Sequence, residues 1–168
     1  AQWQIPYRRG VNPLAWEAAH VAWFHELWTL RGPHRLGADG FVHAARAPVN
    51  AGPDALLDSA RLAHADRWHI ATITREALAD TLARQHAACG VALEQLPDTD
   101  AALYFHRLGL FHEDMHNEAF VWLRATLGYP APAGATLPRF VNTGPVRIDG
   151  VAASLGAAPV GFAFDNES

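Results

Sequence analysis

The sequence has a single cysteine, Cys89, and lacks any long apolar run. One cysteine excludes a disulfide within the chain and is typical of a reducing compartment, so we expect a cytoplasmic protein. No stretch approaches the roughly 18 consecutive apolar residues that a membrane-spanning helix requires, and no signal-peptide pattern is recognisable. These absences predict a protein that has no membrane partner.

Basic residues are few and scattered. The 168 residues include 13 Lys and Arg against 17 Asp and Glu, the formal net charge is -4, and the basic residues form no stripe. Proteins that bind nucleic acids carry a basic patch, so we expect no nucleic-acid partner. Polar low-complexity tracts are absent and half of the residues are hydrophobic, which predicts a chain that folds around a core of ordinary size.

Histidine and tryptophan, in contrast, are frequent, with ten and six copies. His112 and His116 lie four residues apart in a long segment of helical periodicity, so they share one helix face and can reach a single ion. Neutral imidazole is the commonest protein metal ligand. Phe111 and Phe120 flank the pair and are expected to keep such a site dry. The alternative, one histidine satisfied in the core and the other solvated, stays open.

Periodicity and capping residues predict a mainly α-helical fold. Asn12 as N-cap and Pro13 at the first helical position predict a helix that runs to about Leu30. Thr74 and residues 98–100 offer caps for two longer helices. The expected elements are helices over residues 13–30, 75–96 and 101–127, a long loop over 32–53 and a short helix or turn within 54–69. Such helices indicate a bundle, in which metal sites are commonly built between facing helices.

His20 is the best candidate for a third ligand. Trp16, Trp23 and Phe24 surround it on the face of the first helix that is expected to pack inward. A buried imidazole needs a partner for each ring nitrogen, either a hydrogen bond or a metal. His25 lies off this face and is expected to be solvated or paired with a neighbour.

Residues 112–116 also match the pattern H-E-x-x-H of zinc proteases, in which Glu113 would be the general base. A zinc protease needs a further ligand downstream, but no histidine follows His116, and Glu118 points to a different side of the helix. An upstream third ligand is therefore favoured, which gives three neutral nitrogens and leaves positions on the ion open. Fe(II), Zn(II), Ni(II) and Mn(II) all suit this ligand set.

Beyond Tyr129 the character of the sequence changes. Residues 130–134 predict a linker. Short β segments are expected at residues 146–148, 151–155 and 162–164. Because about thirty such residues do not form a core alone, we predict a helical domain over residues 1–130. Residues 131–168 are then a linker and the incomplete beginning of a second domain, and residues before Ala1 are expected to be missing.

Two motifs resemble those of the ergothioneine synthase family, W-x-x-x-H ending at His20 and H-x-x-x-H at His112 and His116. The similarity covers most of the chain in blocks, at residues 12–26, 58–68, 102–108, 111–119 and 161–167. It implies an N-terminal DinB-like four-helix bundle followed by a domain like the formylglycine-generating enzyme, of which this chain holds only the start. The pattern is most similar to the selenoneine synthase branch.

The resemblance implies a non-heme Fe(II) enzyme whose ion is held by His20, His112 and His116. It would use O2 to join a selenium or sulfur donor to the imidazole C2 of hercynine, which is trimethylated histidine. Met115 stands where ergothioneine synthases commonly carry a glutamine that helps to hold hercynine, and this difference favours the selenium branch. Arg67 lies where some relatives bind the carboxylate of the donor. In those relatives a tyrosine comes from the second domain, so no catalytic residue is assigned here.

The sequence leaves three alternative functions open. One is a sulfur-specific sulfoxide synthase of the ergothioneine type. Another is a DinB-like thiol transferase or hydrolase that uses a divalent metal without oxygen. The last is a helical binding module whose histidine pair only packs. A requirement for O2 and Fe(II) distinguishes the first from the second, and metal analysis tests the third.

Overall fold

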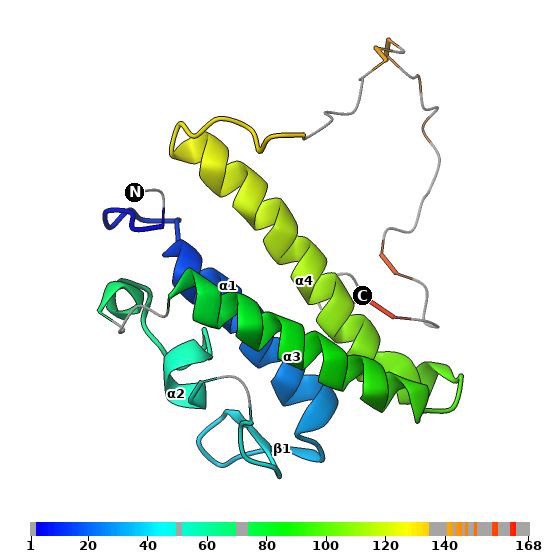
Figure 1. Ribbon diagram of the computed structural model, residues 1–168. Coiled ribbons are helices and arrows are strands. Elements are labelled where there is room, and N and C mark those ends of the chain that lie inside the picture. Colours follow the sequence, from blue (N-terminus) through cyan, green and yellow to red (C-terminus); the bar gives the residue numbers. More distant parts are fainter. Residues whose placement is uncertain are drawn as a thin grey trace.

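The computed structural model describes residues 3–49, 52–69, 74–134, 141–142, 144–145, 147, 150, 156–157 and 162–163. This part of the chain is mainly helical, as the sequence predicts (Figure 1). The helical elements are α1 (Leu14–His25), the π-helical turn η1 (Glu26–Leu30), α2 (Asp54–Leu57), the 3-10 turn η2 (His64–Trp68), α3 (Arg75–Glu94) and α4 (Asp100–Thr126).

The first predicted helix is present, but it begins differently from the prediction. Pro13 occupies the N-cap position, where its carbonyl accepts the Glu17 N–H at 2.9 Å, and no side chain caps the helix. Asn12, the predicted cap, instead donates from its side-chain amide to the Glu17 carboxylate. The helix continues through η1 to Leu30, the predicted end. Wide π turns of this kind are often found at functional sites.

The ends of α3 and α4 follow from local signals, as predicted. The Thr74 hydroxyl accepts the Ala77 N–H at 3.1 Å, and the Thr99 hydroxyl accepts the Ala102 N–H at 3.3 Å. Both bonds satisfy backbone donors that the first turn of a helix leaves unpaired. At the other end of α4, Gly128 has a φ of 70°, a conformation in which glycine carries no Cβ penalty.

The segment expected as a loop over residues 32–53 contains an antiparallel hairpin of β1 (His34–Leu36) and β2 (Val42–Ala44). Strands of three residues are too short to show an alternating pattern, so the sequence gives no signal for them. The hairpin also brings His34 against the end of the first helix. Its Nε2 lies 2.7 Å from the Leu27 carbonyl oxygen and its ring packs beside Trp28.

The single turn α2 is fixed to α1 by polar contacts. The Asp54 carboxylate accepts two hydrogen bonds from the Arg31 guanidinium, at 2.6 and 3.0 Å, and one from the Trp23 indole at 2.8 Å. Paired, charge-assisted hydrogen bonds of this kind fix orientation as well as position. As a result, the carbonyl of Leu57 at the end of α2 faces His20 of α1.

α1 is the central helix, because it packs against both α3 and α4. α3 and α4 lie close together near the short connection that joins them and diverge towards their other ends (Figure 1). One apolar cluster joins α1 to α2, and a second joins the N-terminal segment to the C-terminal half of α4. Their buried members are Trp16, Trp23, Leu27 and Leu57 in the first, and Ile5, Val11 and Leu123 in the second.

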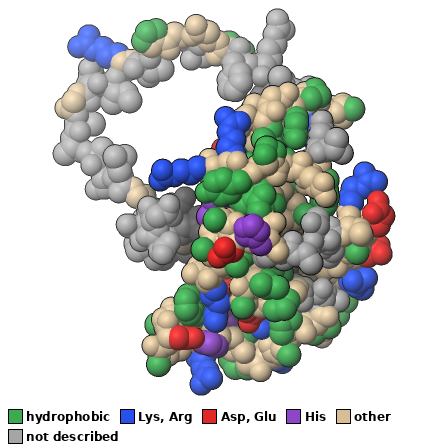
Figure 2. All heavy atoms as spheres, turned by 90° about the vertical axis from the view of Figure 1, so that its left-hand side faces the viewer, with side chains coloured by type: hydrophobic (Ala, Val, Ile, Leu, Met, Phe, Trp, Pro, Cys, Tyr) green, Lys and Arg blue, Asp and Glu red, His purple; other side chains and the backbone are tan. Residues whose placement is uncertain are grey.

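Basic side chains are scattered over the surface, as they are along the sequence. On the face that Figure 2 shows, basic side chains lie among apolar and acidic ones and form no continuous stripe. Within the described ranges, no helix is long and apolar enough to cross a membrane.

The predicted β segments 146–148, 151–155 and 162–164 lie largely outside the described residues. Of their members that are described, Arg147, Phe162 and Ala163 are not in strands. The Phe162 ring does contact α4, with its centroid 5.0 Å from that of Phe111 and 5.4 Å from that of Tyr104.

Two helical glycines provide a matched test of the packing between helices. At Gly109 of α4 an added Cβ would lie 2.6 Å from Cδ2 of His25, whereas at Gly90 of α3 nothing lies within 4 Å. Replacing a helical glycine by alanine gains about 0.5–1 kcal/mol when the space is open. We therefore expect Gly90→Ala to stabilise the chain by about that amount in urea unfolding. Gly109→Ala should give no gain or a loss, and an equal gain for both variants would contradict this packing.

Candidate metal centre

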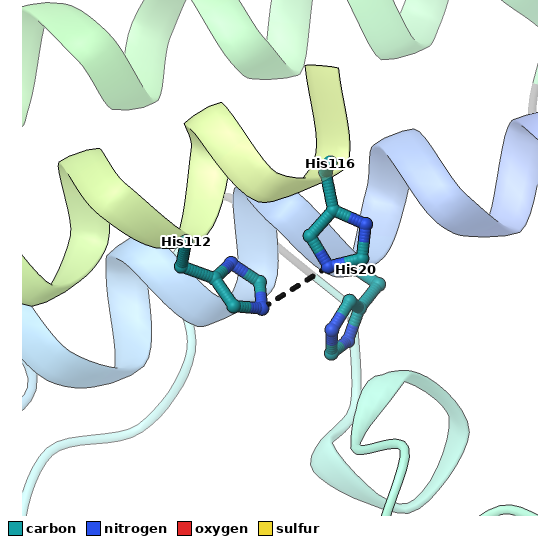
Figure 3. Close-up of side chains that lie close together, drawn as sticks. All are labelled: His20, His112 and His116. Atoms are coloured by element: carbon teal, nitrogen blue, oxygen red, sulfur yellow. Dashed lines mark hydrogen bonds between the residues drawn. The ribbon is translucent and has the colours of Figure 1, made fainter. Parts of the chain in front are cut away.

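Three imidazoles converge between α1 and α4. His20 comes from α1, His112 and His116 come from α4, and one ring nitrogen of each lies within 4.8 Å of the others (Figure 3). The two α4 rings face each other, with 3.2 Å between their Nε2 atoms. The structure thus brings together the three residues that the sequence predicts as ligands. Their binding of an ion stays a prediction.

The spacing of the nitrogens suits a shared ion. Two nitrogens that each lie about 2.1 Å from a metal are about 3.0 Å apart at a right angle and about 3.4 Å apart at a tetrahedral angle. The separation of 3.2 Å between the Nε2 atoms of His112 and His116 falls between these values. The donor set therefore fits a divalent transition metal ion.

Hydrogen bonds orient two of the three rings. His20 Nδ1 lies 2.7 Å from the Leu57 carbonyl oxygen, and His116 Nδ1 lies 2.6 Å from Oε1 of Glu17. Since a carbonyl and a carboxylate can only accept, both Nδ1 atoms carry the proton. The lone pair of each ring is then on Nε2, which is the atom that can bind a cation, and in His116 this atom lies at hydrogen-bond distance from Nε2 of His112.

Aromatic rings enclose the histidines, and those around His20 are the ones that the sequence predicts. The His20 ring stacks on Trp16, with centroids 5.0 Å apart and planes 7° apart, and the His112 ring stacks on Phe24 at 3.6 Å and 7°. The expectation that Phe111 and Phe120 shield the site is wrong. Phe111 is 41% exposed, and Phe120 packs in the apolar cluster around Ile5, Val11 and Leu123.

Burial keeps two of the imidazoles neutral. Removal from water lowers the pKa of His20 from 6.5 to about 4 and the pKa of His112 from 6.5 to about 2. Burial acts in the opposite direction on Glu17 and raises its pKa. The hydrogen bonds from His116 and Asn12 outweigh it and leave the pKa of this carboxyl below its usual value. A metal ion requires neutral imidazoles, so at pH 7 His20 and His112 need lose no proton in order to bind one.

Glu17 and Asn12 are the residues that the sequence analysis missed. Glu17 is 2% exposed, and Asn12 links it to Arg67, whose Nη1 donates to the Asn12 side-chain oxygen at 2.7 Å. The available signal was a carboxylate three residues before His20 on an otherwise apolar helix face. A charged residue placed there needs a buried partner.

The two predicted substrate-binding residues lie at the edge of this centre. The Arg67 guanidinium lies over the Trp16 ring, 4.0 Å from its centroid, and reaches His116 only through Asn12 and Glu17. Burial lowers the pKa of Arg67. Its Nε is buried without a hydrogen-bond partner among the described residues. Met115 is 46% exposed on α4.

Glu113 does not serve the three histidines as the zinc-protease pattern would require. Its Oε2 lies 3.4 Å from Nε2 of His86 on α3 and 3.7 Å from Nε2 of His25 on α1. Adjacent residues of a helix point about 100° apart, so Glu113 lies beside His86 of α3 while the His112 ring stacks on Phe24 of α1. The sequence predicts that His25 is either solvated or paired with a neighbour, and in the structure it is paired with Glu113.

A family model described as DinB superfamily matches residues 1–125. The matched region contains His20, His112 and His116 together with nearly all of the helical elements. No curated protein matched the sequence.

The buried imidazoles predict a pH-dependent stability of the metal-free chain. The unfolded state takes up protons below about pH 6.5, whereas the folded state holds His20 and His112 neutral to about pH 4 or below. The free energy of unfolding should therefore fall between pH 7 and 5, by up to about 1.4 kcal/mol per pH unit for each histidine. Urea unfolding with a chelator present measures this slope, and His112→Asn should make it shallower. A wild-type profile that is level from pH 7.5 to 5 would contradict the burial.

Proposed function

Since the chain belongs to the DinB superfamily, a metal-binding helical fold whose members are often metal-dependent enzymes, we propose that it is an enzyme with a catalytic metal ion at His20, His112 and His116. The main support for this proposal is that three imidazoles from two helices converge. Three protein ligands leave positions on the ion for substrates, which is typical of catalytic rather than structural sites.

Fe(II) is the ion that we propose for this centre. The all-nitrogen ligand set suits Fe(II) among other ions, and the resemblance to the ergothioneine synthase family favours iron. Bound iron would supply the redox chemistry with O2 and a point at which two substrates meet. The chain itself would supply orientation, because Leu57 and Glu17 direct the Nε2 atoms of His20 and His116 to the ion.

The proposed reaction is formation of a C–Se or C–S bond at the imidazole C2 of hercynine, with O2 as the oxidant. Its support is the resemblance of the histidine motifs and of the blocks around them. Arg67 would bind the carboxylate of the selenium or sulfur donor, since guanidinium groups bind carboxylates well. Met115 would contact hercynine in place of the amide of sulfur-specific relatives. We place the domain boundary near residue 130, with the catalytic groups that complete the site in the second domain.

A DinB-like thiol transferase or hydrolase that needs no oxygen is the second candidate. The observation that favours it is the extent of the family match, which covers residues 1–125 and stops just before the end of α4. A helical unit with one metal centre would suffice for that chemistry. Dependence on O2 distinguishes the two functions.

The hydrogen bond from His116 to Glu17 should tune metal affinity. Replacing the orienting partner of a ligand histidine typically costs 10–100-fold in metal affinity. We expect Glu17→Gln to weaken Fe(II) binding at this centre by about that factor under anaerobic titration, and His116→Ala to abolish binding at this centre. His69→Ala changes an exposed histidine and serves as the control with wild-type affinity. Unchanged affinity in His116→Ala would exclude this centre as the iron site.

Oxygen consumption tests the reaction itself. The full-length protein is loaded with Fe(II) without oxygen and then exposed to O2 with hercynine and each candidate donor in turn. We expect O2 uptake that requires both substrates, together with a product substituted at the imidazole C2. Conversion of a thiol substrate without O2 would instead support the transferase. Absence of product with every selenium and sulfur donor would refute the proposed reaction.

A further inference from the structure

A second group of metal-ligating side chains lies where α1, α3 and α4 meet. It consists of His25 from α1, His86 from α3 and Glu113 from α4, and one ligand atom of each lies within 4.8 Å of the others. None of these residues belongs to the centre formed by His20, His112 and His116. Its α4 member, Glu113, points in a different direction from His112, the adjacent residue of the first centre.

The distances within the group are long for hydrogen bonds and suitable for metal ligands. Oε2 of Glu113 lies 3.4 Å from Nε2 of His86 and 3.7 Å from Nε2 of His25. Hydrogen bonds between nitrogen and oxygen are usually about 2.7–3.2 Å long. Two donor atoms that each lie about 2.1 Å from one ion at a tetrahedral angle are about 3.4 Å apart, which matches the distance from Glu113 to His86, and the distance of 3.7 Å to His25 is slightly longer.

The three side chains differ in how far they are buried. Their side chains are 12% exposed for His25, 27% for Glu113 and 52% for His86. Nε2 of His25 is buried and has no hydrogen-bond partner among the described residues, which leaves an unsatisfied polar atom directed at the group. The exposed His86 gives an ion a route from solvent.

Gly109 is part of this arrangement, because His25 lies against it. A Cβ at this position would come within 2.8 Å of Nε2 of His25. The missing side chain therefore lets the imidazole lie between α1 and α4 with its Nε2 near Glu113. Such close packing fixes the least exposed ligand before any ion binds.

We infer that His25, His86 and Glu113 form a second site for a divalent transition metal ion. Two imidazoles and one carboxylate suit Zn(II) and Fe(II), and three protein ligands leave a position for water. The ion would link α3 to the pair of α1 and α4, and it would bind independently of the three-histidine centre. It would thus stabilise the folded chain by mass action.

Zinc titration of the metal-free chain tests this site. By calorimetry, His86→Ala should bind one Zn(II) fewer than the wild type, as should Glu113→Gln. The matched control is His43→Ala, which changes a partly exposed histidine that also lies beside a carboxylate, with Nε2 2.9 Å from Asp39. This control should keep the wild-type stoichiometry. Equal stoichiometry in His86→Ala and wild type, or an equal loss in the control, would overturn the second site.

A second measurement separates the two centres. In a His116→Ala background, which lacks the first centre, added Zn(II) should still raise the melting temperature. The rise should disappear in the double variant His86→Ala, His116→Ala, while His43→Ala with His116→Ala should retain it. A rise that persists in the His86 double variant would refute the proposal, whatever the fate of the first centre.

Discussion

The buried carboxylate of Glu17 is the constraint on which the site depends. A charged group in the interior is tolerated only with hydrogen-bonding partners, and Glu17 has one partner that is close in sequence and one that is distant. Asn12 lies 5 residues from Glu17, just before α1, whereas His116 lies 99 residues after Glu17. The bond to His116 helps to set the register of α4 against α1, and this register also brings His112 close to His20.

Much of the fold is predictable because its signals are local. Thr74 and Thr99 cap helices from within their own first turns, and Gly128 ends α4 through its own conformation. The proximity of His112 and His116 likewise follows from helical spacing alone. Neither inference requires knowledge of how one element packs on another. The hairpin of β1 and β2 escapes this approach because three residues carry too little pattern.

The remaining features depend on how helix faces are oriented towards each other. Periodicity shows that residues share a face, but not which neighbour covers that face. α4 has neighbours on more than one side, so His112 and Glu113, which are adjacent in sequence, serve different groups of side chains. The same limit explains the wrong expectation for Phe111 and the missed role of Phe24, whose ring covers His112 from another helix. Glu17 escaped notice because its partner lies on α4.

The contact between Gly109 and His25 has an evolutionary consequence. Because the imidazole occupies the volume that a side chain at position 109 would need, the two positions cannot vary independently. Related sequences that acquire a bulkier residue at 109 should exchange the histidine at 25 for something smaller. Such sequences would lose the group of His25, His86 and Glu113 but keep His20, His112 and His116. The residues at positions 25 and 109 therefore distinguish relatives that have both groups from relatives that have only the three histidines.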